Sequence, residues 1–336
     1  MRMSRMFASI LVAASLVLAG CGGDDEGRDQ PAESGAETST APEVPDTWPL
    51  TGLQVPGGKS AALTHPVLVL KMDNTSSSAP QVGLGKADLV VEELVEGGVT
   101  RLAVFYYSQV PGNVGPVRSM RASDIGIVSP AEAAMVTSGA APVTIRRIKD
   151  AGITFFAEGA KGFYRDDSRS APYNLFTDMD DVATLVKQKE KRPGDYLPWG
   201  DAADLPNGQP AKKIAASFSG GHTTDWVFRD GGYVNENTYA AEGDHFPADT
   251  VLVLRVKVGD AGYTDPAGNP VPETKLEGTG AALLFHDGRL VRGTWSKKSL
   301  DSALSLSTQA GKLTVPAGRV WIELVPEAGG DVTFTG

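Results

Sequence analysis

Residues 87–108 read ADLVVEELVEGGVTRLAVFYYS, and this stretch decides the fold of the first half of the chain. Two runs rich in apolar and β-branched residues, 87–96 and 99–108, flank a pair of glycines. Two glycines between β-rich runs indicate a hairpin, because glycine adopts the backbone angles of a tight turn without steric cost. We therefore expect two antiparallel strands here, with Glu96 and Thr100 at the tip and Arg101 just beyond it.

The strand before this hairpin is expected at residues 67–73, which read VLVLKMD. A continuous apolar run of this length is typical of a strand that is buried on both faces. Its end delivers Asp73 and Asn74 to a loop. Shorter strand candidates follow at 133–138 and 153–157.

Three helices are expected to flank these strands. The first covers 122–129, and the second begins at Pro142 and stops at Gly152, in agreement with the preference for proline at the start and glycine at the end of a helix. The third begins near Thr177, where an acid three residues later forms a capping pattern. A long polar loop, 158–176, precedes it. We predict an α/β (mixed α+β) domain over residues 48–188, with a mixed sheet and flanking helices.

The second half of the chain is expected to be a smaller domain of mostly β structure, residues 214–336. Four prolines among charged residues and glycines mark 189–213 as the linker. The pair Asp287 and Gly288, between two strand-like runs, is the strongest hairpin signal in the chain. The expected strands are 214–218, 226–229, 251–258, 281–286, 289–296, 312–315 and 320–325.

The first 20 residues have the pattern of an export signal, with a basic start and an apolar run too short to span a bilayer. The sequence Leu18-Ala19-Gly20-Cys21 matches the bacterial lipobox, which implies lipid on Cys21 and attachment to the outer face of the cell membrane. The alternative is a secreted protein with a chance cysteine. Cys21 is the only cysteine, so we expect no disulfide, cysteine-bound zinc or thiol catalysis in the folded part.

Residues 21–47 are predicted to be a disordered acidic tether. They hold eight acidic residues against one arginine and lack large apolar side chains. The formal net charge of the whole chain is −10, so much of the charge lies in this segment and the remainder is close to balanced. A balanced surface argues against nucleic acid as a partner.

The candidate ligand site is a set of arginines in turns and loops, where binding residues concentrate. Arginine suits anions because its planar fork of donors can grip a carboxylate or phosphate with two hydrogen bonds. The alternative is that the arginines form structural ion pairs with Glu92, Glu96, Asp166 and Asp167. The predicted ligand-binding residues are Asn74, Glu96, Thr100, Arg101, Arg118, Ser119, Arg121, Arg165, Asp166, Arg169 and Asn174.

Four carboxylates, Asp73, Glu92, Glu96 and Asp166, form the alternative candidate site. Two carboxylates in different environments are what general acid–base hydrolysis requires. Carboxylates at strand ends also cap turns or pair with arginines, which is the structural alternative. The four histidines are far apart and lack metal-ligand spacing. The sequence therefore predicts neither a metal site nor a cofactor.

Several motifs, taken in their order, resemble the YerB-like bacterial lipoproteins. They are residues 49–53 (PLTGL), 73–74 (DN), 95–101 (VEGGVTR), 115–121 (GPVRSMR), 165–169 (RDDSR) and 172–175 (PYNL). The resemblance covers about residues 49–326. It implies an α/β part followed by a smaller β-rich part, anchorage at the cell surface and no established biochemical activity.

Two positions depart from the pattern of that family. Tyr164 stands where the family tends to have Trp, and Tyr173 stands where it tends to have His. A tyrosine phenol titrates near 10, so Tyr173 cannot replace a histidine base near neutral pH. We therefore predict a noncatalytic lipoprotein that binds an anionic wall component, a peptide carboxylate or a partner protein. The rivals are a hydrolase of envelope polymers and a scaffold for a wall enzyme.

Overall fold

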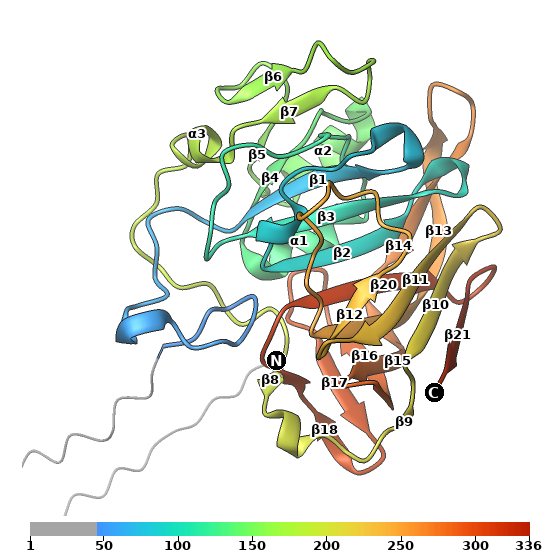
Figure 1. Cartoon of the computed structure of the whole chain (residues 1–336). Helices are drawn as coiled ribbons and strands as arrows, with labels where there is room; N and C mark the ends of the chain where they lie inside the picture. Colours follow the sequence, from blue (N-terminus) through green and yellow to red (C-terminus); the bar gives the residue numbers. More distant parts are fainter. Residues whose placement is uncertain (1–45) are drawn as a thin grey trace, which may run out of the picture. The chain divides into compact units, whose positions relative to one another are not determined.

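The computed structural model describes residues 46–336, and Figure 1 shows their arrangement. The export signal, Cys21 and almost all of the predicted tether lie outside the described residues. No helix within 46–336 has the length and apolar character needed to cross a membrane.

A 13-stranded mixed sheet runs through both halves of the chain. Its main strand order is β18-β17-β16-β15-β13-β20-β2-β3-β1-β4-β5, with β14 paired to β13 and β9 to β16. The strands are β1 Leu68–Asn74, β2 Leu89–Leu94, β3 Thr100–Tyr106, β4 Ala134–Val136, β5 Phe155–Phe156, β9 Gln209–Pro210, β13 Thr250–Thr264, β14 Pro270–Lys275, β15 Gly278–His286, β16 Arg289–Lys297, β17 Ser305–Thr308, β18 Gly311–Leu313 and β20 Val320–Pro326.

Smaller elements cover this sheet (Figure 1). A four-stranded sheet has the order β12-β11-β10-β21, and β8 pairs with β19 and β6 with β7. These strands are β6 Phe163–Arg165, β7 Leu175–Thr177, β8 Trp199–Gly200, β10 Lys213–Ser219, β11 His222–Arg229, β12 Gly232–Asn235, β19 Val315–Pro316 and β21 Asp331–Thr335. The α-helices are α1 Asp124–Val128, α2 Pro142–Asp150 and α3 Met179–Ala183.

The predicted hairpin is confirmed, since β2 and β3 pair in antiparallel register. The turn Glu96–Gly98 (η4) holds Gly97 at φ 76° and Gly98 at φ 73°, angles that a side chain would strain. The strongest hairpin signal is confirmed too, because β15 and β16 pair across Asp287 and Gly288.

The join between the two halves is the parallel pair of β2 and β20. The strand β2 is the first strand of the predicted hairpin at 87–108, whereas β20 comes near the end of the chain. Strands from both sides of the predicted linker therefore share one sheet. The boundaries at 48–188, 189–213 and 214–336 stay predictions.

The mixed sheet was expected, but the helical content was overestimated. The helices α1 and α3 each have five residues and α2 has nine, so the fold is mostly β. Residues 158–176, expected as a loop, contain β6 and the start of β7. The predicted cap of α3 at Thr177 is wrong, because Thr177 belongs to β7 and Asp178 accepts the capping hydrogen bond from the Asp181 N–H.

The apolar core lies on both faces of the large sheet. On one face, Ile127 of α1 and Ile148 of α2 belong to the same apolar cluster as Val91 of β2. On the other face, the four-stranded sheet contributes Trp226 and α3 contributes Met179. All seven residues of β1 and of β20 are buried. The polar side chains on the central strands therefore find their partners inside the protein.

Candidate functional site

Three of the predicted arginines come together at the end of β1, β2 and β3. Glu96, in the hairpin turn, binds two of them: Arg101 Nη2 lies 3.0 Å from Oε1, and Arg121 Nε donates to Oε2 at 2.8 Å. The Nη2 of Arg121 also donates to Oε1. Burial alone would raise the pKa of Glu96, but Arg121 and Arg101 outweigh it and lower that pKa to about 2.

Arg101 and Arg121 use their donors inside the protein. Besides Glu96, Arg101 donates to the Ser119 carbonyl oxygen at 3.1 Å and Arg121 to the Met120 carbonyl oxygen at 2.9 Å. Both residues are buried. Burial and the neighbouring Arg121 lower the pKa of Arg101 to about 10, which reflects the crowding of positive charge. These two arginines hold the turn in shape and offer little to a ligand.

Arg118 differs from them because part of its fork is free. Its Nε lies 2.8 Å from Asp73 Oδ2, and its guanidinium carbon lies 5.3 Å from the centre of the Tyr173 ring. Asp73 is held in turn by the N–H and hydroxyl of Thr75, at 2.9 and 2.6 Å. The side chain of Arg118 is 20% exposed. Its buried Nε forms an ion pair with Asp73 without the alignment of a hydrogen bond, and within residues 46–336 neither Nη atom has a hydrogen-bond partner.

The other two predicted arginines, which lie in the 158–176 segment, also have structural partners. Arg165 grips Glu158 with two hydrogen bonds of 2.7 and 2.8 Å, and its Nη1 donates to Asn174 at 2.6 Å. Arg169 donates to the carbonyl oxygens of Ser78 and Pro80. It also lies 3.3 Å from Asp166, which caps its own turn by accepting from the Ser168 N–H.

A second polar cluster, which we call the Glu92 network, lies on the opposite face of β2. The Glu92 carboxylate accepts from Asn74 at 3.0 Å, Thr100 at 2.7 Å and Trp321 at 3.2 Å. His222 Nε2 lies 2.8 Å from it. Burial lowers the pKa of His222, but its hydrogen bond and charge interaction with Glu92 outweigh that effect and raise it. Asn74 and Thr100, predicted as ligand-binding residues, thus face Glu92.

Glu323 of β20 completes the Glu92 network. It is fully buried, accepts from Trp226 Nε1 at 2.8 Å, and its Oε2 has no hydrogen-bond partner within the described residues. Burial and the adjacent Glu92 raise the pKa of Glu323 well above its usual range. Burial opposes the ionisation of Glu92, but the hydrogen bond and charge of His222 outweigh it and lower the pKa of Glu92. The raised pKa of Glu323 and the lowered pKa of Glu92 favour the state in which a single proton of the pair lies on Glu323.

A third cluster lies next to the arginines. Lys71 Nζ lies 2.7 Å from Glu93 Oε1 and 2.8 Å from Asp124 Oδ1, and all three side chains are fully buried. One lysine thus faces two carboxylates. Burial raises the pKa of Glu93 to about 7 although Lys71 opposes the change.

The four carboxylates proposed for hydrolysis are dispersed among these contacts. Asp73 pairs with Arg118, Glu96 with two arginines, and Asp166 with its own turn. Only Glu92 faces a second carboxylate, and that partner is Glu323, which the sequence did not single out. Both members of that pair are fully buried.

Sequence reasoning missed Lys71, Asp124, His222 and Glu323. One signal was available for two of them, because Lys71 and Glu323 each interrupt a continuous apolar run of strand length. A charge in such a run must be buried with a partner. The run does not say which partner, and His222 carried no signal of its own.

Comparisons with known proteins agree with the motifs. Residues 50–192 match the family described as "Protein of unknown function (DUF3048) N-terminal domain", and residues 214–322 match its C-terminal domain. The chain is 25% identical over 301 residues to the protein named "Putative lipoprotein YerB" of Bacillus subtilis (strain 168), which covers 84% of this chain and 89% of that relative.

A solved structure shares the fold. The crystal structure of the YerB protein from Bacillus subtilis superposes with a TM-score of 0.71 at 20% identity, over 85% of this chain and 99% of that one. The resemblance to YerB-like lipoproteins is therefore confirmed over both halves of the chain.

Proposed function

Since the chain belongs to the DUF3048 family of unknown function, we propose that it is a noncatalytic, membrane-anchored lipoprotein that binds an anionic envelope ligand at Arg118. The anchor is lipid on Cys21, at the lipobox motif, and the folded part then works on the outer face of the cell membrane. The name of the Bacillus subtilis relative as a lipoprotein supports this anchor.

One observation carries the binding proposal: Arg118 has a fixed guanidinium with a free edge. Asp73 holds Nε and the Tyr173 ring lies under the plane, so the fork is ordered before a ligand arrives. Ordering the donors in advance reduces the entropy lost on binding. The free Nη edge can then donate two parallel hydrogen bonds to one anionic group.

The local charge supports the same conclusion. Arg101, Arg118 and Arg121 stand against two carboxylates, Asp73 and Glu96. Arg101 and Arg121 share the single carboxylate of Glu96, so the excess positive charge arises at this pair. Arg118 is paired with Asp73, but it is the arginine next to them whose Nη edge is free. In this proposal, the other predicted residues shape the neighbouring segment: Arg165, Asp166, Arg169 and Asn174.

The test is binding of the mature chain to anionic envelope polymers, one rich in phosphate and one rich in carboxylate, at two salt concentrations. We expect binding that weakens with salt and falls at least about tenfold in Arg118→Ala, because a hydrogen bond to a charged group contributes roughly 1.5–3 kcal/mol. Arg118→Lys keeps the charge and loses the fork, so it should also bind more weakly.

Arg146 provides the matched control, since it is an exposed arginine on α2. Arg146→Ala removes the same charge and should retain binding. If Arg118→Ala and Arg118→Lys both fold and bind as the wild type does, the anion site at Arg118 is wrong.

A further inference from the structure

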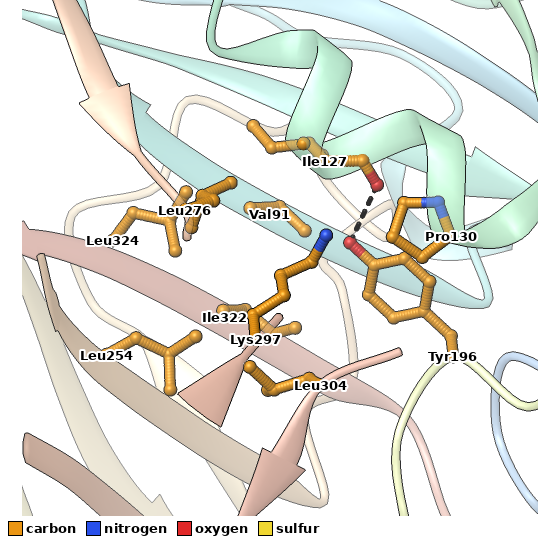
Figure 2. A pocket seen from close by; sticks show the side chains of 11 residues that line it. Val91, Ile127, Pro130, Tyr196, Leu254, Leu276, Lys297, Leu304, Ile322 and Leu324 are labelled. Atoms are coloured by element: carbon orange, nitrogen blue, oxygen red, sulfur yellow. Dashed lines mark hydrogen bonds between the residues drawn. The ribbon is translucent and has the colours of Figure 1, made fainter. Parts of the chain in front are cut away.

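A small cavity lies on the face of the large sheet opposite the Glu92 network. Its volume is about 30 Å³, which is room for roughly two or three water-sized atoms. Its walls are apolar and come from both halves of the chain: Val91 of β2, Ile127 of α1, Leu254 of β13, Leu304 before β17, and Ile322 and Leu324 of β20. Lys297, at the end of β16, enters this cavity (Figure 2).

The amine of Lys297 is enclosed but only partly bonded. The residue is 5% exposed, and its Nζ donates to the carbonyl oxygens of Ser299, at 3.1 Å, and Leu300. An ammonium group has three N–H donors, so one remains. Figure 2 shows the amine reaching toward the end of the cavity where the Tyr196 hydroxyl donates to the Ile127 carbonyl oxygen at 2.9 Å.

No carboxylate neutralises this amine within the described part of the chain. Lys297 forms no ion pair within 4.0 Å there, and Asp301 and Glu277 act on it only from a distance. Burial lowers the pKa of Lys297 to about 8. At pH 7 an amine with that pKa is still charged in roughly nine molecules of ten. A buried charge without a counter-ion is costly.

We propose that the cavity binds a small monovalent anion, of a size from chloride to formate, on Lys297. The ligand should be negatively charged, because the Lys297 ammonium is the one charged group among the described residues that line the cavity. The volume sets the upper limit of size and excludes phosphate polymers, peptides and acyl chains. The apolar walls favour a monovalent ion over a divalent one, since a second negative charge would lack a partner.

The cavity is separate from the proposed site at Arg118. A negative result for the cavity would therefore not affect the proposed function. Its lining residues come from both halves of the chain: Val91 and Ile127 belong to the first half, and Leu254 and Ile322 belong to the second. An anion held there by Lys297 would lie between residues of both halves.

The test is the titration of the Lys297 side chain by NMR in sodium formate and in sodium benzenesulfonate at equal ionic strength. An anion that binds the ammonium form raises the titration midpoint, and the benzenesulfonate ion is too large for the cavity. We expect the midpoint to be about one pH unit higher in formate when formate is about tenfold above its Kd. Equal midpoints in the two salts would overturn the proposal.

Lys298 serves as an internal control, because it is the exposed neighbour on the chain. Its midpoint should be the same in both salts, and an equal shift at Lys298 would indicate a general salt effect and overturn the site. Lys297→Met keeps an unbranched apolar stem. In that variant, formate should lose its advantage over benzenesulfonate in the thermal melting temperature.

Discussion

Glu92 and Glu323 are direct cross-strand partners in the parallel pair of β2 and β20, and both are fully buried. One lies in the segment that matches the N-terminal family domain, and the other near the end of the chain, next to the segment that matches the C-terminal domain. Two ionised carboxylates at this spacing would repel each other inside the core, so a single proton on Glu323 lets the strands pair. We therefore expect the stability of the join between the two halves to depend on the protonation of Glu323.

Replacing Glu323 by Gln should remove a pH dependence of stability. The pKa of Glu323 is raised in the folded state. The stability that Glu323 contributes is therefore complete below its pKa in the unfolded chain, about 4.3, and is lost as the pH rises toward its folded pKa. In Glu323→Gln the amide can donate to Glu92 and accept from Trp226. We expect the variant to gain about 1.4 kcal/mol over the wild type for each pH unit between that unfolded value and the folded pKa of Glu323.

Denaturant unfolding at pH 5, 7 and 9 measures this difference. Glu327→Gln, in an exposed residue just beyond β20, is the matched control and should follow the wild type. Parallel curves for wild type and Glu323→Gln would contradict the protonated pair.

His222 should stabilise the fold most at acidic pH. Its folded pKa is raised above 6.5, since Glu92 outweighs the effect of burial, so its contribution is complete below that value and is lost as the pH rises through the folded pKa. We expect His222→Gln to lower the free energy of unfolding by roughly 1–3 kcal/mol at pH 6 and by less at pH 9. His245→Gln, at an exposed position, should have little effect, and equal losses at both pH values would refute the ion pair.

The local elements of the fold could be predicted because their signals are local. The glycine pair at 97–98 and the run at 67–73 each specify a turn or a strand from a few neighbouring residues, and both predictions are confirmed. The helix predicted at 122–129 is present as α1, Asp124–Val128, but it is shorter than predicted, because sequence patterns locate the ends of an element less reliably than its presence.

The pairing of distant segments could not be predicted in the same way. The run at 320–325 predicts a buried strand, but nothing in it selects β2 as a neighbour more than 200 residues earlier. The Glu92 network depends on that pairing, and so does the cavity at Lys297. The arginines of 115–121 were predicted to be near Glu96. The side-chain contacts that leave one of them with a free edge are given only by the structure.

Lys71 and Glu93 should respond differently to neutral substitution. Lys71→Met leaves Glu93 and Asp124 buried without a cation, and breaking a buried pair in this way costs roughly 3–5 kcal/mol. The pKa of Glu93 is raised to about 7, so the stability it contributes declines as the pH rises from about 4.3 to 7. Glu93→Gln should therefore become more stable relative to wild type across that range. Unfolding at pH 4.5 and 7.5 tests this, and a Glu93→Gln penalty as large as that of Lys71→Met at pH 7.5 would contradict it.

Glu96 should be the most important acidic residue of the arginine cluster. It is the shared counter-ion of Arg101 and Arg121, and its pKa is lowered to about 2 because the two arginines outweigh burial. Its stabilising contribution is therefore present above about 4.3 and is lost as the pH falls toward 2. At pH 7 we expect Glu96→Gln to cost roughly 3–5 kcal/mol, since two largely buried guanidinium groups lose their carboxylate.

Glu158 supplies the matched comparison for Glu96, because it also grips an arginine with two hydrogen bonds but is 43% exposed. Glu158→Gln should cost less than about 1 kcal/mol, as exposed ion pairs do. Denaturant unfolding of both variants at pH 7 and pH 3 separates the two cases. The difference in free energy of unfolding between wild type and Glu96→Gln should be smaller at pH 3 than at pH 7. If that difference stays constant with pH, or if the two variants lose the same free energy of unfolding, Glu96 acts through packing and not through its charge.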